Sequence, residues 1–262
     1  MAIVPNEPVL ALRGISKRFG AVQALTDVHL EVHAGEVVAL VGDNGAGKST
    51  LVKTIAGAGP ADDGVVQWCG RPVQIQRPHD AQELGIATVY QDLALCDNID
   101  VVGNLFLGRE LRRAGALDEV EMERRSLELL STLSIRIPSV RIPIASLSGG
   151  QRQTVAIARS MLGNPKLVIL DEPTAALGVE QTAQVLDLVE RLRERGLAVI
   201  LISHNMADVK AVADRVAVLR LGRNNGTFDV RTTSQEEIIA AITGATDNAV
   251  SRRKARNGEV AK

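Results

Sequence analysis

A glycine-rich segment has the residue types and spacing of a phosphate-binding loop, the P-loop. It follows an apolar run at 37–41 and leads into a helical pattern at 51–56, which is the setting this motif requires. Its glycines let successive backbone N–H groups face one anion, and the helix presents its positive end to the same phosphates. We expect Lys48 to reach the β- and γ-phosphates of a nucleotide and Ser49 to bind Mg²⁺. The nucleotide-binding segment comprises Gly42, Asp43, Asn44, Gly45, Ala46, Gly47, Lys48, Ser49 and Thr50.

Two adjacent acids, Asp171 and Glu172, end a second apolar run at 167–170. Open α/β sheets place their ligands at such carboxyl ends of strands. A buried carboxylate needs a cation or hydrogen bonds to balance its charge, and Mg²⁺ is the obvious cation beside a P-loop. We expect Asp171 to hold the metal and Glu172 to orient or deprotonate the attacking water. The alternative is that the acids only cap the next helix.

A second glycine-rich helix start, Ser148, Gly149, Gly150 and Gln151, precedes a helical pattern at 152–162. Such a start can also bind phosphate. Because Lys48 already holds one terminal phosphate, this second cradle makes most sense facing a nucleotide held by another copy of the chain. It could also be a simple helix cap.

The elements that must position these residues alternate along the second half of the chain. Short apolar runs predict buried strands, and the three-to-four spacing of apolar residues at 179–195 predicts a helix. This alternation is typical of a parallel α/β sheet. The predicted strands lie at 37–41, 167–170, 197–202 and 216–219.

The rest of the chain follows other patterns. Short strands separated by turns predict an antiparallel β layer in the first part. Helical spacing and higher charge density predict a helical insertion at 97–135, and Ser234 to Glu237 has the form of a capping box that starts a last helix. The predicted antiparallel strands lie at 9–12, 28–32, 65–68 and 73–75.

Composition excludes several classes of protein. The chain has 262 residues, 45% hydrophobic and 23% charged, which is typical of folded globular proteins. With 30 basic and 31 acidic residues there is no positive field to attract nucleic acid, so we expect no nucleic-acid partner. No apolar run approaches the roughly 20 residues that span a bilayer, and the N-terminus does not resemble a secretory signal. We expect Cys69 and Cys96 to be small buried residues of a cytoplasmic protein.

These motifs together resemble the ATPase subunits of ATP-binding cassette (ABC) transporters, over about residues 9–244. The segment from Leu147 to Gln151 matches the signature loop of that family. The resemblance implies that Gln91 is the glutamine that touches the metal and senses the membrane subunits, and that His204 is the switch histidine at the γ-phosphate. It also implies that Phe19 stacks on adenine, with a place in the core as the alternative.

The resemblance implies the fold, the cofactors and the domain organisation. The fold would be α/β, a P-loop NTPase (RecA-like) core with an antiparallel β subdomain and a helical insertion subdomain. The core would span 8–91 and 160–246, and the helical signature subdomain 92–159. The composition of the segment at 247–262 predicts a polar basic tail, expected to be disordered. ATP and Mg²⁺ would be the cofactors, and the metal ligands would be Ser49, Gln91 and Asp171.

The resemblance also implies partners. Two copies would close head to tail, each nucleotide lying between one P-loop and the other chain's signature loop. Permease subunits would seat helices near Gln91 and the helical insertion, which places the chain peripherally on the cytoplasmic face of the inner membrane. Nearby apolar residues would either line that dock or form the core of the insertion. They are Leu93, Leu95, Ile99, Leu105 and Phe106.

Residues 91–110 and 175–179 resemble bacterial monosaccharide importers of the ribose, xylose and fructose kind, which would add an indirect partner, a solute-binding protein. One departure is Gly178, where the family commonly has an Asp that contacts the partner cassette.

A cassette ATPase acting on DNA or ribosomes remains an alternative, although we see neither a long coiled-coil insertion nor a second cassette. A nucleotide-gated binding module is a further alternative, and the presence of Glu172 argues against it.

Overall fold

The computed structural model describes residues 7–245, so the predicted tail at 247–262 lies outside the described residues. Its main sheet has the strand order β12-β11-β3-β10-β9-β6. All neighbouring strands are parallel except the edge pair β11 and β12, which is antiparallel. These strands are β3 (Val37–Val41), β6 (Ile86–Val89), β9 (Leu167–Asp171), β10 (Ala198–Ile202), β11 (Arg215–Arg220) and β12 (Arg223–Asp229).

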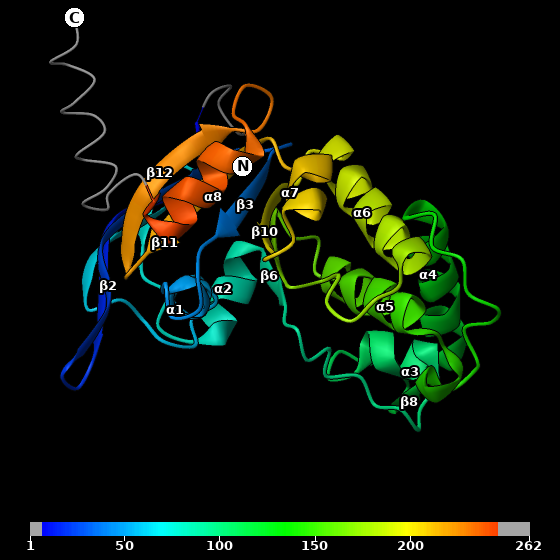
Figure 1. The fold of residues 1–262 in the computed structure, drawn as a ribbon. Helices are drawn as coiled ribbons and strands as arrows, with labels where there is room; N and C mark the ends of the chain where they lie inside the picture. Colours follow the sequence, from blue (N-terminus) through cyan, green and yellow to red (C-terminus); the bar gives the residue numbers. More distant parts are fainter. Residues whose placement is uncertain (1–6, 246–262) are drawn as a thin grey trace, which may run out of the picture.

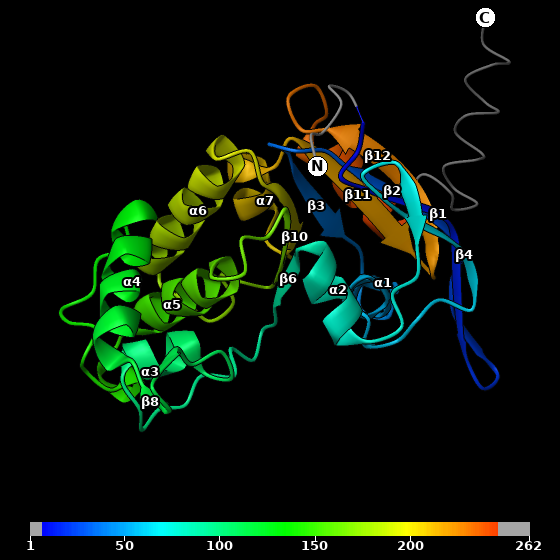
Figure 2. The ribbon, with the colours of Figure 1, turned by 180° about the vertical axis from the view of Figure 1, so that it is seen from behind.

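A separate antiparallel sheet has the order β2-β1-β4-β5. It lies against one side of the main sheet, as Figures 1 and 2 show. An antiparallel layer was expected here, and the structure confirms it. Its strands are β1 (Leu10–Phe19), β2 (Val22–Val32), β4 (Asp63–Trp68) and β5 (Arg71–Val73). β1, β2 and β4 are longer than predicted, and β5 lies at 71–73 instead of 73–75.

Helices cover the main sheet, and a helical lobe projects from the side opposite the antiparallel sheet (Figures 1 and 2). The helices near the main sheet are α1 (Lys48–Ile55), α2 (Pro78–Leu84), α6 (Val179–Glu194), α7 (Met206–Val212) and α8 (Gln235–Thr243). The lobe contains α3 (Val101–Phe106), α4 (Glu119–Thr132), α5 (Gly149–Met161), the small strands β7 (Arg112–Arg113) and β8 (Ala116–Leu117), and a short 3₁₀ helix at Ile144–Ser146.

The main sheet is buried on both faces, because successive strand residues point to opposite sides. In β3, Val37, Ala39 and Val41 join one hydrophobic core, which extends into the helical lobe. Val38 and Leu40 join the second core, shared with α1 and the antiparallel sheet. Burial on both faces explains why these strands read as continuous apolar runs in the sequence.

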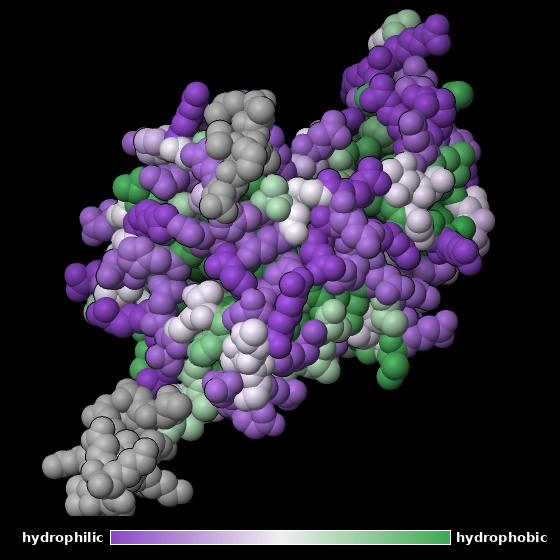
Figure 3. Space-filling view, turned by 90° about the horizontal axis from the view of Figure 1, so that it is seen from above, coloured by the Kyte–Doolittle hydropathy of each residue, from purple (hydrophilic) through white to green (hydrophobic). Residues whose placement is uncertain are grey.

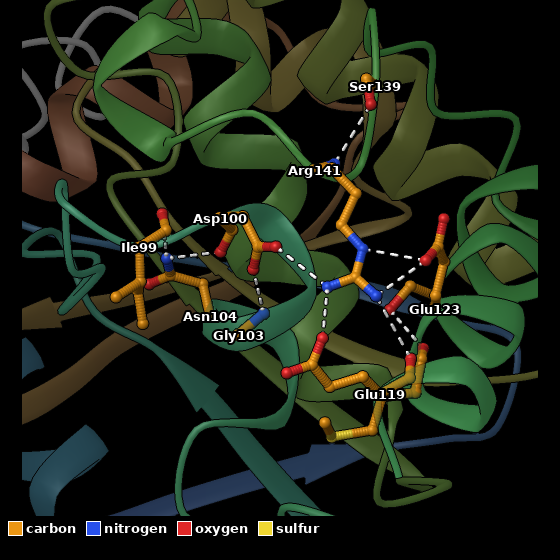
Figure 4. A network of polar contacts seen from close by, with 10 residues as sticks. Ile99, Asp100, Gly103, Asn104, Glu119, Glu123, Ser139 and Arg141 are labelled. Atoms are coloured by element: carbon orange, nitrogen blue, oxygen red, sulfur yellow. Dashed lines mark hydrogen bonds and ion pairs between the residues drawn. The ribbon is translucent and has the colours of Figure 1, made fainter. Parts of the chain in front are cut away.

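A charged network holds the helical lobe together (Figure 4). The Arg141 guanidinium donates to Glu123 at 2.8 Å and lies 3.3 Å from a Glu119 carboxylate oxygen, both on α4. It also lies 3.4 Å from Asp100, whose other carboxylate oxygen accepts the Gly103 N–H at the start of α3. One side chain thus ties the starts of α3 and α4 to the loop before the 3₁₀ helix.

Polar residues cover most of the face seen in Figure 3. Among the described residues, no helix combines the length and the apolar character needed to cross a membrane. One expectation about burial was wrong: Cys96 is only half-buried, in the loop after β6. Of the two roles left open for the apolar residues near Gln91, Leu105 and Phe106 take the one in the core.

Candidate nucleotide site

The predicted P-loop connects β3 to α1, and two of its glycines are required by sterics. A Cβ at Gly42 (φ 156°) would lie 2.3 Å from the Leu219 carbonyl oxygen. A Cβ at Gly47 (φ 103°), the N-cap of α1, would lie 2.8 Å from the Leu25 side chain. The loop can therefore wrap closely only with glycine at both positions. The Lys48 ammonium donates to the Gly42 and Asp43 carbonyl oxygens, at 2.7 and 3.1 Å.

The predicted acidic pair lies at the carboxyl end of β9. Asp171 is its last residue and pairs in register with Ile202 at the end of β10. Glu172 has φ 50°, and its N–H donates to the Ile202 carbonyl oxygen at 3.0 Å. A positive φ is uncommon for a residue with a side chain, and such strained residues cluster at functional sites.

The structure brings the P-loop, Glu172 and His204 together around one cavity of about 470 Å³. His204 follows β10, and its Nδ1 lies 2.7 Å from a Glu172 carboxylate oxygen. The imidazole is 75% exposed, whereas the Glu172 side chain is 17% exposed. An acid-histidine pair thus faces the lysine of the phosphate-binding loop. The cavity is lined by Val41, Gly42, Asp43, Asn44, Lys48, Glu172, Ser203, His204, Met206 and Ile242.

A second cavity of about 440 Å³ covers the rest of the P-loop, residues 44–50. Its other walls are residues 22–24 of β2 and the turn between β11 and β12. Phe19 lies at the end of β1 with 53% of its surface exposed, so the alternative of a core role is wrong. The Lys17 ammonium lies 5.6 Å from the centre of the Phe19 ring.

The electrostatics of the acidic pair favour a bound cation. Burial and the neighbouring charge of Glu172 raise the pKa of Asp171, and Lys48 offsets only part of this rise. Burial and the charge of Asp171 also raise the pKa of Tyr90, which follows β6. Two acids in a half-buried position therefore carry more negative charge than one lysine balances.

Two other groups of predicted residues lie away from these cavities. Gln91 is exposed after β6 and lines neither cavity. Residues 148–151 form a capping box at the start of α5: the Ser148 hydroxyl accepts the Gln151 N–H at 3.3 Å, and the Gln151 side-chain oxygen accepts the Ser148 N–H at 3.0 Å. They too line neither cavity.

The loop after Glu172 leads into α6, whose start contacts the start of α5. A Cβ at Gly150 would lie 2.9 Å from the Gln181 side chain, so the start of α5 packs closely on the start of α6. Gly178 is the N-cap of α6 with φ −73°, and nothing lies within 4 Å of a Cβ placed on it. The backbone there is ordinary, so the position could accept a residue with a side chain, such as the Asp that the resemblance leads one to expect.

Sequence reasoning missed a link between the loops that carry Glu172 and His204. Asp208, a buried residue of α7, accepts the Thr174 hydroxyl at 2.6 Å and the Asn205 side-chain amide at 3.0 Å. One buried carboxylate thereby fixes the segment after Glu172 and the residue after His204. The only signal in the sequence was an acid four residues after His204, in the first turn of the helix that follows it.

A groove of about 440 Å³ lies between the main sheet and the helical lobe. Tyr90 and Leu93 line it from the segment after β6, and Arg159 lines it from α5. The Arg159 guanidinium donates to the Leu93 and Ala94 carbonyl oxygens, both at 2.8 Å. Burial lowers the pKa of Arg159. The groove thus adjoins the segment that contains Gln91.

Comparison with known proteins gives the family. Residues 25–175 match the family described as ABC transporter. The fructose import ATP-binding protein FrcA of Rhizobium meliloti is 43% identical over 248 residues, which cover 92% of this chain and 95% of that protein. The xylose/arabinose import ATP-binding protein XylG of Sulfolobus acidocaldarius is 44% identical over 235 residues, covering 90% of this chain and 94% of that protein.

Solved structures agree. The ADP conformation of MJ1267, an ATP-binding cassette of an ABC transporter, has a TM-score of 0.78 at 26% identity, covering 90% of this chain and 95% of that one. A dimeric post-hydrolysis state of the cassette MJ0796, bound to ADP and Pi, has a TM-score of 0.71 at 25% identity, covering 86% of this chain and all of that one. The chain therefore belongs to the ABC transporter family, as one of its ATP-hydrolysing cassettes.

Proposed function

We propose that this cassette energises the import of a monosaccharide, as the ATPase subunit of a transporter on the cytoplasmic face of the cell membrane. The observation that carries the ATPase site is the single cavity that holds Lys48, Glu172 and His204. Support for the sugar comes from the relatives, which are named as fructose and as xylose/arabinose import ATP-binding proteins.

Each of these side chains has a proposed task. Lys48 exchanges its contacts with two loop carbonyl oxygens for the β- and γ-phosphates of ATP. Glu172 orients the attacking water and accepts its proton, because it lines the cavity with Lys48 and is less exposed than Asp43, the other acid of that lining. His204 holds Glu172 through the 2.7 Å contact and is exposed enough to reach the γ-phosphate.

The donor set fits Mg²⁺. The Ser49 hydroxyl and the Asp171 carboxylate are hard oxygen donors of the kind this ion prefers, and Gln91 is proposed as a further ligand. Residues 7–245 contain no cluster of three or more His, Cys, Asp or Glu residues suited to a metal. Mg²⁺ at nucleotide sites binds one or two carboxylates and completes its shell with substrate phosphates and water, and Asp171 would supply a carboxylate. When bound, Mg²⁺ neutralises charge on the phosphates.

A second copy completes the site. Residues 148–151 lie away from the P-loop of their own chain, so we assign them to the nucleotide of the partner, in a head-to-tail homodimer. The proposed domain division has a helical signature subdomain at 92–159 and a core at 8–91 and 160–246. Permease subunits dock at the groove beside Gln91, and a solute-binding protein takes part indirectly by delivering the sugar.

Turnover by a Glu172→Gln variant tests the catalytic site. The amide keeps the size of the side chain but cannot accept a proton, so ATP binding should persist while hydrolysis falls by roughly 100-fold or more. Sedimentation with ATP should then show a trapped dimer. The control is Glu128→Gln, an exposed acid on α4 that pairs with Arg124. Near-normal phosphate release by Glu172→Gln would refute the assignment.

Copurification tests the transport role. The tagged chain, extracted in mild detergent from its native cells, should bring along a permease and a sugar-binding protein. Ligands released from that binding protein should be monosaccharides. Recovery with ribosomes or DNA instead would overturn the transport proposal while leaving the ATPase site intact.

A further inference from the structure

The two-residue turn between β11 and β12 contains a leucine where the backbone favours other residues. Leu221 and Gly222 both have positive φ, 49° and 75°, and Arg220 pairs with Arg223 on either side of them. Two-residue hairpin turns with two positive φ angles strongly prefer Asn-Gly, Asp-Gly or Gly-Gly, because a larger side chain clashes with its own backbone. Leu221 is therefore a local conflict between the residue and its conformation.

The surrounding structure imposes this conformation. The Gly222 N–H donates to the Ala46 carbonyl oxygen of the P-loop at 3.0 Å, and the Gly222 carbonyl oxygen accepts the Thr26 N–H at 2.7 Å. A Cβ at Gly222 would lie 2.6 Å from the Ala24 carbonyl oxygen. The turn is thus clamped between β2 and the P-loop, and Leu221 cannot relax without breaking that clamp.

No packing of the Leu221 side chain offsets this unfavourable backbone conformation. Its side chain is 76% exposed, and it belongs to neither hydrophobic core of the described residues. It lines the cavity of about 440 Å³ that covers residues 44–50 of the P-loop, together with Val22, which is 65% exposed. Two exposed apolar side chains therefore share one cavity with the groups expected to bind phosphate.

We infer that Leu221 is a contact for the nucleoside part of bound ATP. The inference rests on the proposed ATP site, because the phosphates at residues 44–50 place the attached nucleoside within the same cavity. A purine and its ribose present flat apolar surface, which gains free energy when it covers exposed leucine and valine side chains. Phe19 was the residue expected at adenine, whereas Leu221 comes from a turn some 200 residues later in the chain.

The test separates binding through the nucleoside from binding through the phosphates. The Leu221→Asn variant suits the positive φ, so its thermal stability should equal or exceed that of the wild type. Its Kd for ATP, measured by calorimetry, should rise roughly fivefold, since it loses apolar contact. Its Kd for tripolyphosphate, which has no nucleoside, should not change. Leu221→Met should retain wild-type affinity for ATP.

Leu117→Asn is the matched control, because it removes an exposed leucine from β8 in the helical lobe and should leave both dissociation constants unchanged. Unchanged ATP affinity in Leu221→Asn would overturn the inference. An equal loss for ATP and tripolyphosphate would also overturn it, because the variant would then act through the P-loop. If the wild type bound neither ligand, the proposed ATP site itself would fail, which is a different result.

Discussion

Asp171 and Glu172 differ in how the fold treats them, although they are neighbours in the sequence. Burial and the adjacent carboxylate raise the pKa of Asp171. The Glu172 side chain instead contacts His204, and its backbone takes a positive φ. The first acid thus lacks sufficient counter-charge, and the second is held in place by its neighbours. This division suits a metal ligand beside a general base.

The raised pKa of Asp171 predicts that removing its charge increases the stability of the fold but decreases ATP hydrolysis. A carboxyl with a raised pKa binds its proton more tightly in the folded state, so its contribution favours the fold below its ordinary pKa and weakens as the pH rises. Asp171→Asn removes that charge. The melting temperature of the nucleotide-free variant should therefore exceed that of the wild type, and by more at pH 8 than at pH 5.

Hydrolysis by Asp171→Asn should meanwhile fall on the order of 100-fold or more, because a ligand for Mg²⁺ is lost. Thermal unfolding at the two pH values and phosphate release check both parts. The control is Asp187→Asn, an exposed acid on α6, which should change stability by no more than about 0.5 kcal/mol. A lower melting temperature for Asp171→Asn at pH 8 would show that its carboxylate stabilises the empty site.

Much of the candidate site was predictable because each motif carries its own local signal. The P-loop glycines and the acids after an apolar strand can be read from a short window of sequence. The contacts between residues of different windows cannot be read in this way. The bond of Asp208 to Thr174, and the position of Leu221 beside the P-loop, join segments 34 or more residues apart. Such pairs depend on the order of strands in the sheet.

At the scale of elements, the strands of the main sheet that could be predicted were those buried on both faces. Residues 37–41 form β3 as expected, because burial on both faces leaves a continuous apolar run. β12, at the edge of the sheet, was missed, because its residues are mostly polar and exposed and include Gly226. β6 was missed because it has only four residues, one of them Thr88. Edge strands and short strands are stabilised by pairing with neighbouring strands more than by the β-propensity of their own residues.

The start of α6 predicts how a single capping residue affects a helix. Gly178 is the N-cap, and its N–H lies 3.4 Å from the Gln181 side-chain oxygen, which is one half of a capping box. Gly178→Asp would supply the other half by accepting the Gln181 N–H. It would also place a negative charge at the positive end of the helix. We expect it to increase the free energy of unfolding by about 0.5 kcal/mol.

Urea unfolding checks this prediction, and Gly178→Ala is the control. Alanine cannot cap and is much less favoured than glycine at this position, so it should decrease the free energy of unfolding. The two changes in the free energy of unfolding should have opposite signs. Both substitutions remove the flexibility of glycine, so opposite signs would be due to the cap. A gain from both would mean that flexibility, and not the cap, limits the stability of this helix.

At the scale of the whole molecule, the separation of the P-loop from residues 148–151 determines how many chains one site needs. Ser148 caps α5 in the helical part, while Lys48 lies at the main sheet, and neither cavity at the P-loop includes the Ser-Gly-Gly turn. On the proposal that this turn binds phosphate, it would act on the nucleotide of another chain. A dimer with twofold symmetry then has two equivalent sites.

Mixing two inactive variants tests whether the site is shared between chains. Lys48→Ala removes the phosphate lysine. Ser148→Asp keeps a good N-cap for α5 but places a negative charge where the γ-phosphate would lie. Each variant alone should be inactive. After coexpression, a mixed dimer has one site with both defects and one with none, because each site takes its P-loop and its Ser-Gly-Gly turn from different chains.

If pairing is random, half of the dimers are mixed and each has one intact site of two, so the mixture should recover about a quarter of wild-type ATPase activity. The recovered activity should also scale with the fraction of mixed dimers isolated by two different tags. Sites that used both elements of one chain would recover nothing, because every chain in the mixture has one defect. This measurement therefore decides between a shared and a single-chain site without requiring the transported sugar or the permease.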